Sequence, residues 1–476
     1  MKLVRLAAAL AGSLWLAGCA LPRPPADVPP AAPPQWYAPL PHDGRLADLQ
    51  QWWQQFNDPL LIELIAAAQA VSPDVASAGA RIAEARATRI GANSALLPAL
   101  DASASASRGN SQPGVPLATI VQGGLQASWE IDLFGGQRAA ADAAAARLDG
   151  SQAGWHAARV AVAAETASAY LDLRTCERQL AVTRNDAQSR AETARLSGLS
   201  ARAGFTAPAV AAQARASAAE GAVRTTQQQA QCELDVKSLV ALTGLQEPAL
   251  RARLREPWSE PVGFALNALP AVPAQLLAQR PDVYQAERAV AAASADVGST
   301  LADRFPRLSL TGQLNAGIVR AGGATTDVQT WSIGPLALSL PLFDAGRRAA
   351  NVDAAEARYQ EAVALYTARV RQAVREVEEA LVRLESARDR SENAQIAVEG
   401  YRASFAATQA RYSSGLASLI ELEDQRRVTL VSELALVALQ QERIAAWIAL
   451  YRALGGGWQR PGAVALSPNE QEGTAT

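Results

Sequence analysis

The stretch that decides the fold is LQASWEIDLFGGQRAAADAAAA, residues 125–146. From Leu125 to Leu133 apolar and polar side chains alternate, which is typical of a strand with two unlike faces. At Gly135 and Gly136 the alternation stops, and an alanine-rich run dotted with charges predicts a helix. The same succession recurs in LALSLPLFDAGRRAANVDAAEA, residues 336–357. The chain is therefore expected to pass from a strand directly into a helix twice.

The chain repeats an order of landmarks at a nearly constant separation. The pairs are Pro73/Pro281 and Pro98/Pro306 at 208 residues, Phe134/Phe343 at 209, and Gly204/Gly415 and Gly244/Gly455 at 211. Solenoid repeats are far shorter than this, so the sequence indicates an internal duplication. Each half is expected to contain a helix, two strands, a long helix, a tight turn and a second helix.

Composition and these landmarks predict six segments. They are a lipoprotein signal peptide (1–18), a Pro-rich extended tether (19–57), a first repeat (58–244), a linker (245–269), a second repeat (270–458) and a C-terminal tail (459–476). Strands are expected near 98–109, 119–134, 306–319 and 328–343. Proline-free stretches at 137–199 and 347–412 predict helices of roughly 90 Å. Helices of that length indicate coiled-coil-like packing or the wall of a tube.

The N-terminus has the pattern of a targeting segment. Lys2 and Arg5 precede an apolar stretch that ends in LAGC, residues 16–19. The stretch has the length of a signal peptide and is short for a membrane-spanning helix. A cysteine directly after a small-residue site resembles a bacterial lipoprotein signal, so Cys19 is expected to carry a lipid; an ordinary signal peptide with an incidental cysteine is the alternative. Ala20, where an aspartate often signals inner-membrane retention, favours the outer membrane.

The remaining composition argues against several classes of function. The net charge of −2, with 19% charged residues, gives no bulk attraction to nucleic acid. The two histidines, His42 and His156, do not form a metal-ligand pattern. The Ser-rich stretches lack the context of a nucleophile elbow. We therefore expect no enzyme activity, no metal and no cofactor apart from the covalent lipid on Cys19.

Four strands per chain raise the question of a membrane. Sheets in lipid must close on themselves, and closed barrels need about eight strands or more. If these strands enter a membrane, several chains must combine them; two soluble hairpins on a helical bundle would alternate in the same way. In a barrel, Glu130 and Asp132 are the lumen-facing candidates, because they alternate with Trp129 and Ile131.

Cys176 and Cys232 each lie 28 residues from Gly204. On two antiparallel helices joined at that turn they would have similar heights, and the periplasm is oxidising. A disulfide is one interpretation. Two buried thiols that face different ways are the other, because equal height does not set the rotation of the helices.

Several strings, taken in order, carry a family resemblance. They are ASWEIDLFGGQRAA (127–140), RPDVYQAERAVAAASADVGSTLADRFPRLSLTG (280–312), LSLPLFDAGRRAANVDAAEARYQEAVALY (338–366) and YRALGGGW (451–458). Together they resemble the outer-membrane efflux protein family (TolC-like), specifically its lipoprotein branch, from about Gln51 to Trp458. The resemblance implies a mainly α protein with membrane β. In it three chains contribute four strands each to one 12-stranded β-barrel, which continues into a long periplasmic α-helical tunnel.

The resemblance also assigns expected roles to residues. Gly135, Gly136 and Gly346 would mark the junction where barrel wall becomes tunnel wall. The helix reversals would form the far end of the tunnel, with tip and gate candidates at Arg202, Gly204, Arg411, Tyr412 and Gly415. Several relatives carry an acidic residue soon after the second tip glycine. This chain instead has Leu416, Ala417 and Ser418, and its nearest acids are Glu421, Glu423 and Asp424.

The function implied by the resemblance is a passive exit duct. A homotrimer would act as the outer-membrane channel of a tripartite efflux pump of the RND type and release drugs or other small molecules. Its partners would be a periplasmic adaptor (membrane fusion protein), an inner-membrane transporter and outer-membrane lipid of a Gram-negative bacterium. A second hypothesis comes from a different class: a lipid-anchored periplasmic coiled-coil scaffold or adaptor without a pore.

Overall fold

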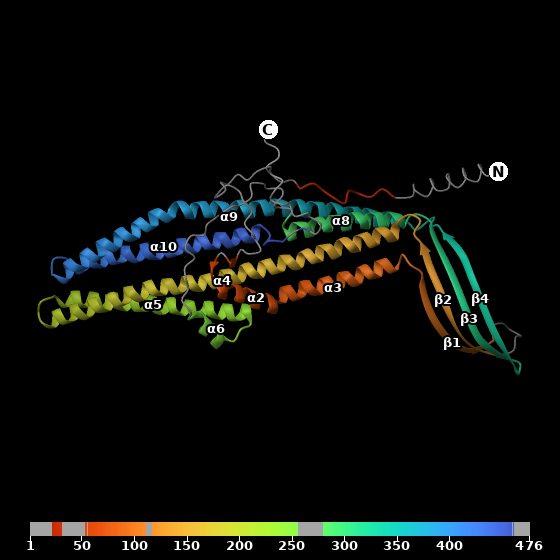
Figure 1. Ribbon diagram of the computed structural model, residues 1–476, viewed down its shortest axis with the longest axis horizontal. Coiled ribbons are helices and arrows are strands. Elements are labelled where there is room, and N and C mark those ends of the chain that lie inside the picture. Colours follow the sequence, from red (N-terminus) through yellow and green to blue (C-terminus); the bar gives the residue numbers. More distant parts are fainter. Residues whose placement is uncertain are drawn as a thin grey trace, which may run out of the picture. The chain divides into compact units, whose positions relative to one another are not determined.

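The structure is a computed structural model that describes residues 21–30, 53–54, 56–110, 117–255, 279–458 and 460. Most of these residues are helical, and four strands form one sheet (Figure 1). The elements are α2 (Pro59–Val71), α3 (Pro73–Ser94), β1 (Ala99–Gly109), β2 (Ala118–Ile131), α4 (Gly136–Arg202), α5 (Pro208–Thr243), α6 (Glu247–Leu254), α8 (Pro281–Ala302), β3 (Arg307–Ala321), β4 (Ala324–Ser339), α9 (Arg347–Ser413) and α10 (Leu419–Ala453).

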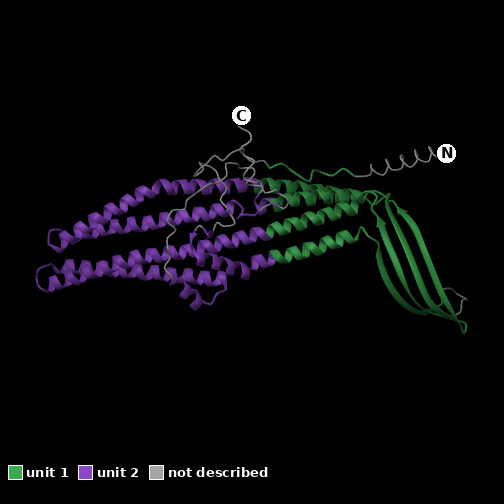
Figure 2. Ribbon diagram, in the orientation of Figure 1, with its two compact units in different colours: residues 1–30, 78–154, 284–369 green, residues 31–77, 155–283, 370–476 purple. Residues whose placement is uncertain are grey.

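The chain divides into two compact units, and each unit draws on both sequence repeats (Figure 2). Unit 1 contains Met1–Pro30, Ala78–Gly154 and Tyr284–Arg369. Unit 2 contains Ala31–Ser77, Trp155–Val283 and Val370–Thr476. The compact units therefore do not coincide with the repeats, because each unit combines segments of both.

The sheet of unit 1 is antiparallel, with the strand order β1-β2-β3-β4. Its central pair, β2 with β3, joins the two repeats. The register places like side chains opposite each other: Trp129 faces Leu310, whereas Glu130 faces Ser309. One face of the sheet is consequently apolar and the other polar, as the alternation predicts. The apolar face is largely exposed, and its members include Leu100, Leu125, Leu314, Trp331, Leu336 and Leu338.

Two strands end earlier than the sequence analysis placed them. β2 was expected to reach residue 134 and β4 residue 343, but they end at Ile131 and Ser339. Both pair with β3, which begins only at Arg307 because Pro306 before it cannot donate to the ladder. Ser339 pairs with Arg307, so the residues beyond Ser339 have no β3 residue to pair with, whereas β2 ends one residue before the position opposite Arg307.

The start of β4 also differs from the expectation. The expected strand began near residue 328, yet β4 begins at Ala324, which pairs with Ala321. The two residues between them, Gly322 and Gly323, both have positive φ angles of 56° and 85°. Such a two-residue turn suits glycine and matches the twist of the flanking strands. The hairpin is therefore tight, and residues that alternation alone left as a loop are paired.

α4 and α9 contain 67 residues each, or about 100 Å of helix. This agrees with the long helices predicted at 137–199 and 347–412. No single helix within the described ranges is both long enough and apolar enough to cross a bilayer. The pair α2 and α3, bent by 51° at the break between them, is long and apolar enough when the two helices are taken together.

The core of unit 2 is built where α2 meets α4. Tyr170 of α4 is fully buried, and its hydroxyl donates to the Asp58 carboxylate at 2.6 Å. Burial raises the pKa of Tyr170, and the bond to Asp58 adds to the rise, so the hydroxyl stays a donor. Arg174 donates both to Tyr170 and to the Leu254 carbonyl oxygen at 3.0 Å, which fastens α6. The expected linker at 245–269 therefore contains a packed helix at its start.

The N-terminal segments are only partly described. Residues 1–18 and Cys19 lie outside the described residues, as does the predicted tail except for Arg460. Residues 21–30 of the expected tether are described, and they pack against unit 1 through ion pairs and hydrogen bonds. The expected tether is thus bound to unit 1 over this stretch, because helix side chains of unit 1 donate to its backbone carbonyl groups.

Candidate functional site

The two long helix pairs of unit 2 reverse through equivalent turns. In the first, Gly204 has φ +78° and the Phe205 amide donates to the Ser200 carbonyl oxygen at 2.9 Å. In the second, Gly415 has φ +75° and the Leu416 amide donates to the Arg411 carbonyl oxygen at 2.7 Å. A positive φ and this bond to a residue five positions earlier characterise a helix end that terminates at glycine. The first helix of each hairpin therefore ends with the same backbone conformation.

The side chains expected at these turns have different environments. Arg202 is exposed. Arg411 donates to the Leu416 carbonyl oxygen at 3.2 Å and lies 3.9 Å from the Glu421 carboxylate, so it stays within its own turn. Tyr412 instead reaches the other hairpin, where its hydroxyl lies 2.9 Å from Ser197 Oγ of α4. Among the side chains of Arg202, Arg411 and Tyr412, the described hydrogen bond between the two hairpins is that of Tyr412.

A buried cluster of charges lies further along the same helices, and its two arginines were not among the expected site residues. Arg190 of α4 is buried, and its guanidinium donates to Asp186 at 2.8 Å and to Glu423 of α10 at 2.6 Å. Ser217 of α5 donates to the same Glu423 oxygen at 2.8 Å. A single carboxylate of α10 therefore holds side chains from both helices of the first hairpin.

Arg426 completes this cluster from the α10 side. Its side chain is 3% exposed, it pairs with Glu423, and it donates to Ser189 and Thr193 of α4 at 3.1 and 3.0 Å. Burial lowers the pKa of Arg426; Glu423 opposes the change and Arg190 adds to it. Among the described residues, Arg426 Nε and one oxygen of Asp186 are buried without a hydrogen-bond partner. We call Asp186, Arg190, Glu423 and Arg426 the hairpin clamp.

The hairpin clamp couples two coiled segments that are distant in sequence. Buried ion pairs hold their geometry strictly, because losing one partner leaves the other charge without solvation. Gly221 allows the helices of the first hairpin to approach here: a Cβ on it would lie 3.0 Å from Arg190 Cδ. The sequence carries a weak signal of the clamp in the spacings Asp186–Arg190 and Glu423–Arg426, which place each pair on one helix face.

The expected junction glycines lie where strands give way to the long helices. Gly135 and Gly346 have φ angles of +78° and +86°, which glycine adopts without strain. Asp132 was expected in a barrel strand facing the lumen, and its placement in the strand is wrong. It follows the last strand residue, and its carboxylate accepts hydrogen bonds from the amides of Gln137 and Arg138 at 3.2 and 2.9 Å. Asp132 therefore caps the start of α4.

Glu130 remains within β2, on the polar face of the sheet opposite Ser309. Its side of the strand also carries Ser128 and Gln126, which pair with Thr311 and Gln313. The polar face is thus continuous across the central strand pair. This placement agrees with the expected alternation and leaves its lumen-facing role as a prediction.

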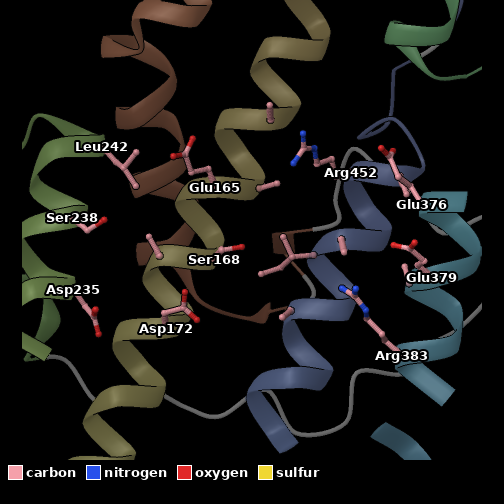
Figure 3. Close-up of a pocket in the computed structure, with 18 residues that line it drawn as sticks. Glu165, Ser168, Asp172, Asp235, Ser238, Leu242, Glu376, Glu379, Arg383 and Arg452 are labelled. Carbon is pink, nitrogen blue, oxygen red and sulfur yellow. The ribbon is translucent and has the colours of Figure 1, made fainter. Parts of the chain in front are cut away.

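A hollow of about 730 Å³ lies between the two helix pairs within unit 2 (Figure 3). Its charged lining consists of Glu165, Asp172, Asp235, Glu376 and Glu379 against Arg383 and Arg452. Burial raises the pKa of Asp172, although Gln441 donates to it and opposes the rise. The lining residues of α4 lie on the opposite side of that helix from Tyr170 and Arg174, since the two sets differ by about half a turn. The hollow therefore has an acidic wall on the face of α4 turned away from α2.

In the structure Cys176 of α4 and Cys232 of α5 are joined by a disulfide, with 5.5 Å between their Cα atoms. Both side chains are buried. The disulfide fixes the rotation of α4 relative to α5, which the equal heights of the two cysteines did not determine.

Replacing both cysteines by alanine is expected to lower the free energy of unfolding by about 2–4 kcal/mol, because the link closes a long loop in the unfolded chain. The thermal unfolding midpoint of the double variant against the parent measures the loss. Titration of the denatured, unreduced parent should find neither thiol free; two free thiols would end the disulfide assignment.

Candidate metal ligands were sought among the described residues. Across the part of the chain that the structure covers, no group of three or more His, Cys, Asp or Glu side chains could hold a metal ion. His156 packs beside Trp155 and Trp458, and burial followed by the nearby Arg159 charge lowers its pKa. This histidine therefore belongs to an aromatic packing cluster.

Comparison with known proteins connects this architecture to a family. The family model described as Outer membrane efflux protein matches the chain twice, over residues 64–245 and 272–456. The two matches correspond to the two sequence repeats. Together they cover well over half of the chain.

Individual proteins agree with the family match. The Pyoverdine export outer membrane protein OpmQ of Pseudomonas putida is 30% identical over 480 residues, covering 96% of this chain and 99% of OpmQ. The solved structure of the outer-membrane channel OprN is 30% identical with a TM-score of 0.77, covering 91% of this chain and 100% of that one. The outer membrane channel CmeC of Campylobacter jejuni has a TM-score of 0.81 at 25% identity, covering 92% and 95%. The chain therefore belongs to the outer membrane efflux protein family.

Proposed function

We propose that this protein is the outer-membrane exit duct of a tripartite efflux pump and passes small molecules through a water-filled path. The observation that carries the proposal is the four-stranded sheet with one exposed apolar face, in a chain whose other elements are long helices. Large contiguous apolar patches on a protein surface normally contact lipid or another protein. A sheet that is apolar on one side and polar on the other suits a wall between lipid and water.

The sheet also supports an assembly of identical copies. Its outer strands, β1 and β4, each leave one edge without a strand partner in the chain's own sheet. Unpaired backbone groups are too costly in hydrocarbon, so the edges must pair with neighbouring chains. Three chains would supply twelve strands, enough to close a barrel. We propose a homotrimer on this ground.

The long helices would then line a tunnel that is closed at the hairpin ends. The hairpin clamp and the Ser197–Tyr412 contact hold the two hairpins of one chain together, which suits a resting closed state. A periplasmic adaptor bound at the hairpin ends would release them, and an inner-membrane transporter would supply the energy. OpmQ is named for pyoverdine export; for this chain we propose small-molecule cargo in general, with the acidic hollow of unit 2 facing the water-filled path.

The proposed location is the outer membrane, with a lipid on Cys19 as an additional anchor. The barrel does the spanning in this scheme, since one lipidated residue anchors without crossing the bilayer. The duct itself carries out no covalent chemistry and requires no cofactor.

A lipid-free protein tests the proposal. We expect the Cys19→Ala chain, exported behind an ordinary secretory signal, to fractionate with outer membranes and to conduct ions after purification into planar bilayers. A scaffold or adaptor tethered only by its lipid would become soluble on the same change and would not conduct. Soluble, non-conducting protein would therefore favour the scaffold hypothesis over the duct.

A further inference from the structure

Residues 21–30, the strap, lie across three helices of unit 1. Arg23 pairs with Asp142 of α4 at 3.0 Å, and Asp27 lies 3.4 Å from Arg288 of α8. The Tyr359 hydroxyl of α9 donates to the Pro25 carbonyl oxygen at 2.9 Å. α4 belongs to the first repeat, whereas α8 and α9 belong to the second. The strap therefore connects both repeats within one compact unit.

The contacts with the strap backbone are made by buried side chains. Ser294 of α8 is fully buried, and its hydroxyl donates to the Pro24 carbonyl oxygen. Tyr359 is also buried. A buried hydroxyl requires a hydrogen-bond partner, and here the partner is the strap itself. The strap is therefore a packed part of unit 1.

The strap runs antiparallel to α8. Going backwards along the strap, Asp27 contacts Arg288, Pro24 contacts Ser294, and Arg23 lies against Gly298. α8 ends at Ala302, shortly before the first residue of β3 at Arg307. The chain upstream of Arg23 is therefore directed toward the end of unit 1 where the strands begin.

We propose that the strap sets the height of the lipidated N-terminus relative to the membrane edge of the sheet. Cys19 precedes Arg23 by four residues, and four extended residues reach at most about 14 Å. From Gly298 to the end of α8 is only about 6 Å. The docked strap thus holds the lipid attachment point within reach of the boundary between helices and strands. The inference rests on the proposed function in two respects, namely that the strands enter the membrane and that Cys19 carries a lipid.

An engineered disulfide tests whether the strap is docked. A Cβ built on Gly298 lies 3.6 Å from Arg23 Cβ, which is within the range of a disulfide, and its other near neighbour, Ala139, leaves ordinary contact space. We expect Arg23→Cys with Gly298→Cys to crosslink in the full chain, detected as a linked peptide by mass spectrometry of an unreduced digest. Asp27→Cys with Gly298→Cys is the matched control, since Asp27 contacts α8 about 15 Å away. A link in neither pair, or equal links in both, would overturn docking.

A shortened chain tests whether docking sets the lipid height. Deleting Ala20, Leu21 and Pro22 from the crosslinking variant leaves about 4 Å of reach, short of the roughly 6 Å from Gly298 to the end of α8. Crosslink yield in native outer membranes should fall about fivefold or more in the lipidated protein, because the lipid pulls against the strap. It should stay unchanged in the lipid-free protein with the same deletion, and in a lipidated control with Leu21→Gly and Pro22→Gly. Labelling with palmitate verifies lipidation.

Each result has a distinct meaning. An unchanged crosslink yield in the shortened, lipidated protein would overturn the height-setting role, even if the strap is docked. Failure of the proposed duct function would appear separately, as absence of conductance in the lipid-free protein, and the first crosslink does not depend on conductance.

Discussion

Replacement of Glu423 by alanine is expected to turn a mostly closed duct into a mostly open one. Glu423 is the carboxylate that both arginines of the hairpin clamp share. Without it, Arg190 and Arg426 remain buried with one carboxylate, Asp186, between them. Removing one partner of a buried ion pair costs about 3–5 kcal/mol. Separation of the hairpins would hydrate both guanidinium groups and relieve that cost, so the closed state is penalised selectively.

The size of the expected shift follows from that cost. About 3 kcal/mol corresponds to more than a 100-fold change in the ratio of closed to open molecules. Single-channel recording in planar bilayers measures this ratio directly as the open fraction. We expect the open fraction of the Glu423→Ala protein to rise toward unity without an adaptor present.

The neighbouring residue offers a matched control. Asp424 forms an ion pair with Arg427 at 3.2 Å in which both side chains are largely exposed. Exposed pairs contribute at most about 1 kcal/mol, so Asp424→Ala should leave the open fraction nearly unchanged. Equal behaviour of the two variants, with both proteins folded as trimers, would contradict the role of the hairpin clamp.

Replacement of Leu314 by arginine is expected to abolish assembly in the outer membrane. Leu314 is the middle residue of β3 and lies on the exposed apolar face, opposite Leu125 and Trp331. An arginine on the lipid face near the bilayer midplane costs about 2–4 kcal/mol. A trimer carries three copies, so the total reaches about 6–12 kcal/mol. The amount of heat-resistant trimer in outer-membrane fractions measures the loss.

Gln313 provides the control at the same depth. It is the preceding residue of β3 and therefore points to the polar face. Gln313→Arg should assemble normally, because a charge facing water carries little cost. If Gln313→Arg failed and Leu314→Arg assembled, the faces of the sheet would be assigned the wrong way round.

Much of the sheet and the long helices could be predicted from local sequence, because each depends on a period that neighbouring residues share. Alternation in both strands predicts which residues share a face, and in the structure Trp129 lies opposite Leu310 and Glu130 opposite Ser309. The ends of the strands could not be predicted in this way, because they depend on pairing with a neighbouring strand. β2 stops at Ile131, one residue before the position opposite Arg307, where the Asp132 carboxylate binds the first amides of α4 instead. Asp132 consequently became a helix cap.

The hairpin clamp shows a limit of a different kind. Arg190 and Glu423 are separated by 233 residues, and their pairing depends on the rotation of two coiled segments about their axes. The periodicity of neighbouring residues does not predict how the two segments are rotated relative to each other. The turns at Gly204 and Gly415 could be found from the repeat, whereas the buried charges between them could not. The strap was missed because a proline-rich sequence has no apolar period, although its carbonyl groups can still be bound.

One chain carries too few strands to seal itself from lipid, so we expect it to share a barrel with identical copies. Native mass spectrometry of the purified, lipid-free protein released from detergent micelles tests this most directly. We expect a mass of three chains as the dominant species. A dominant single chain, extracted from the outer membrane in folded form, would contradict it.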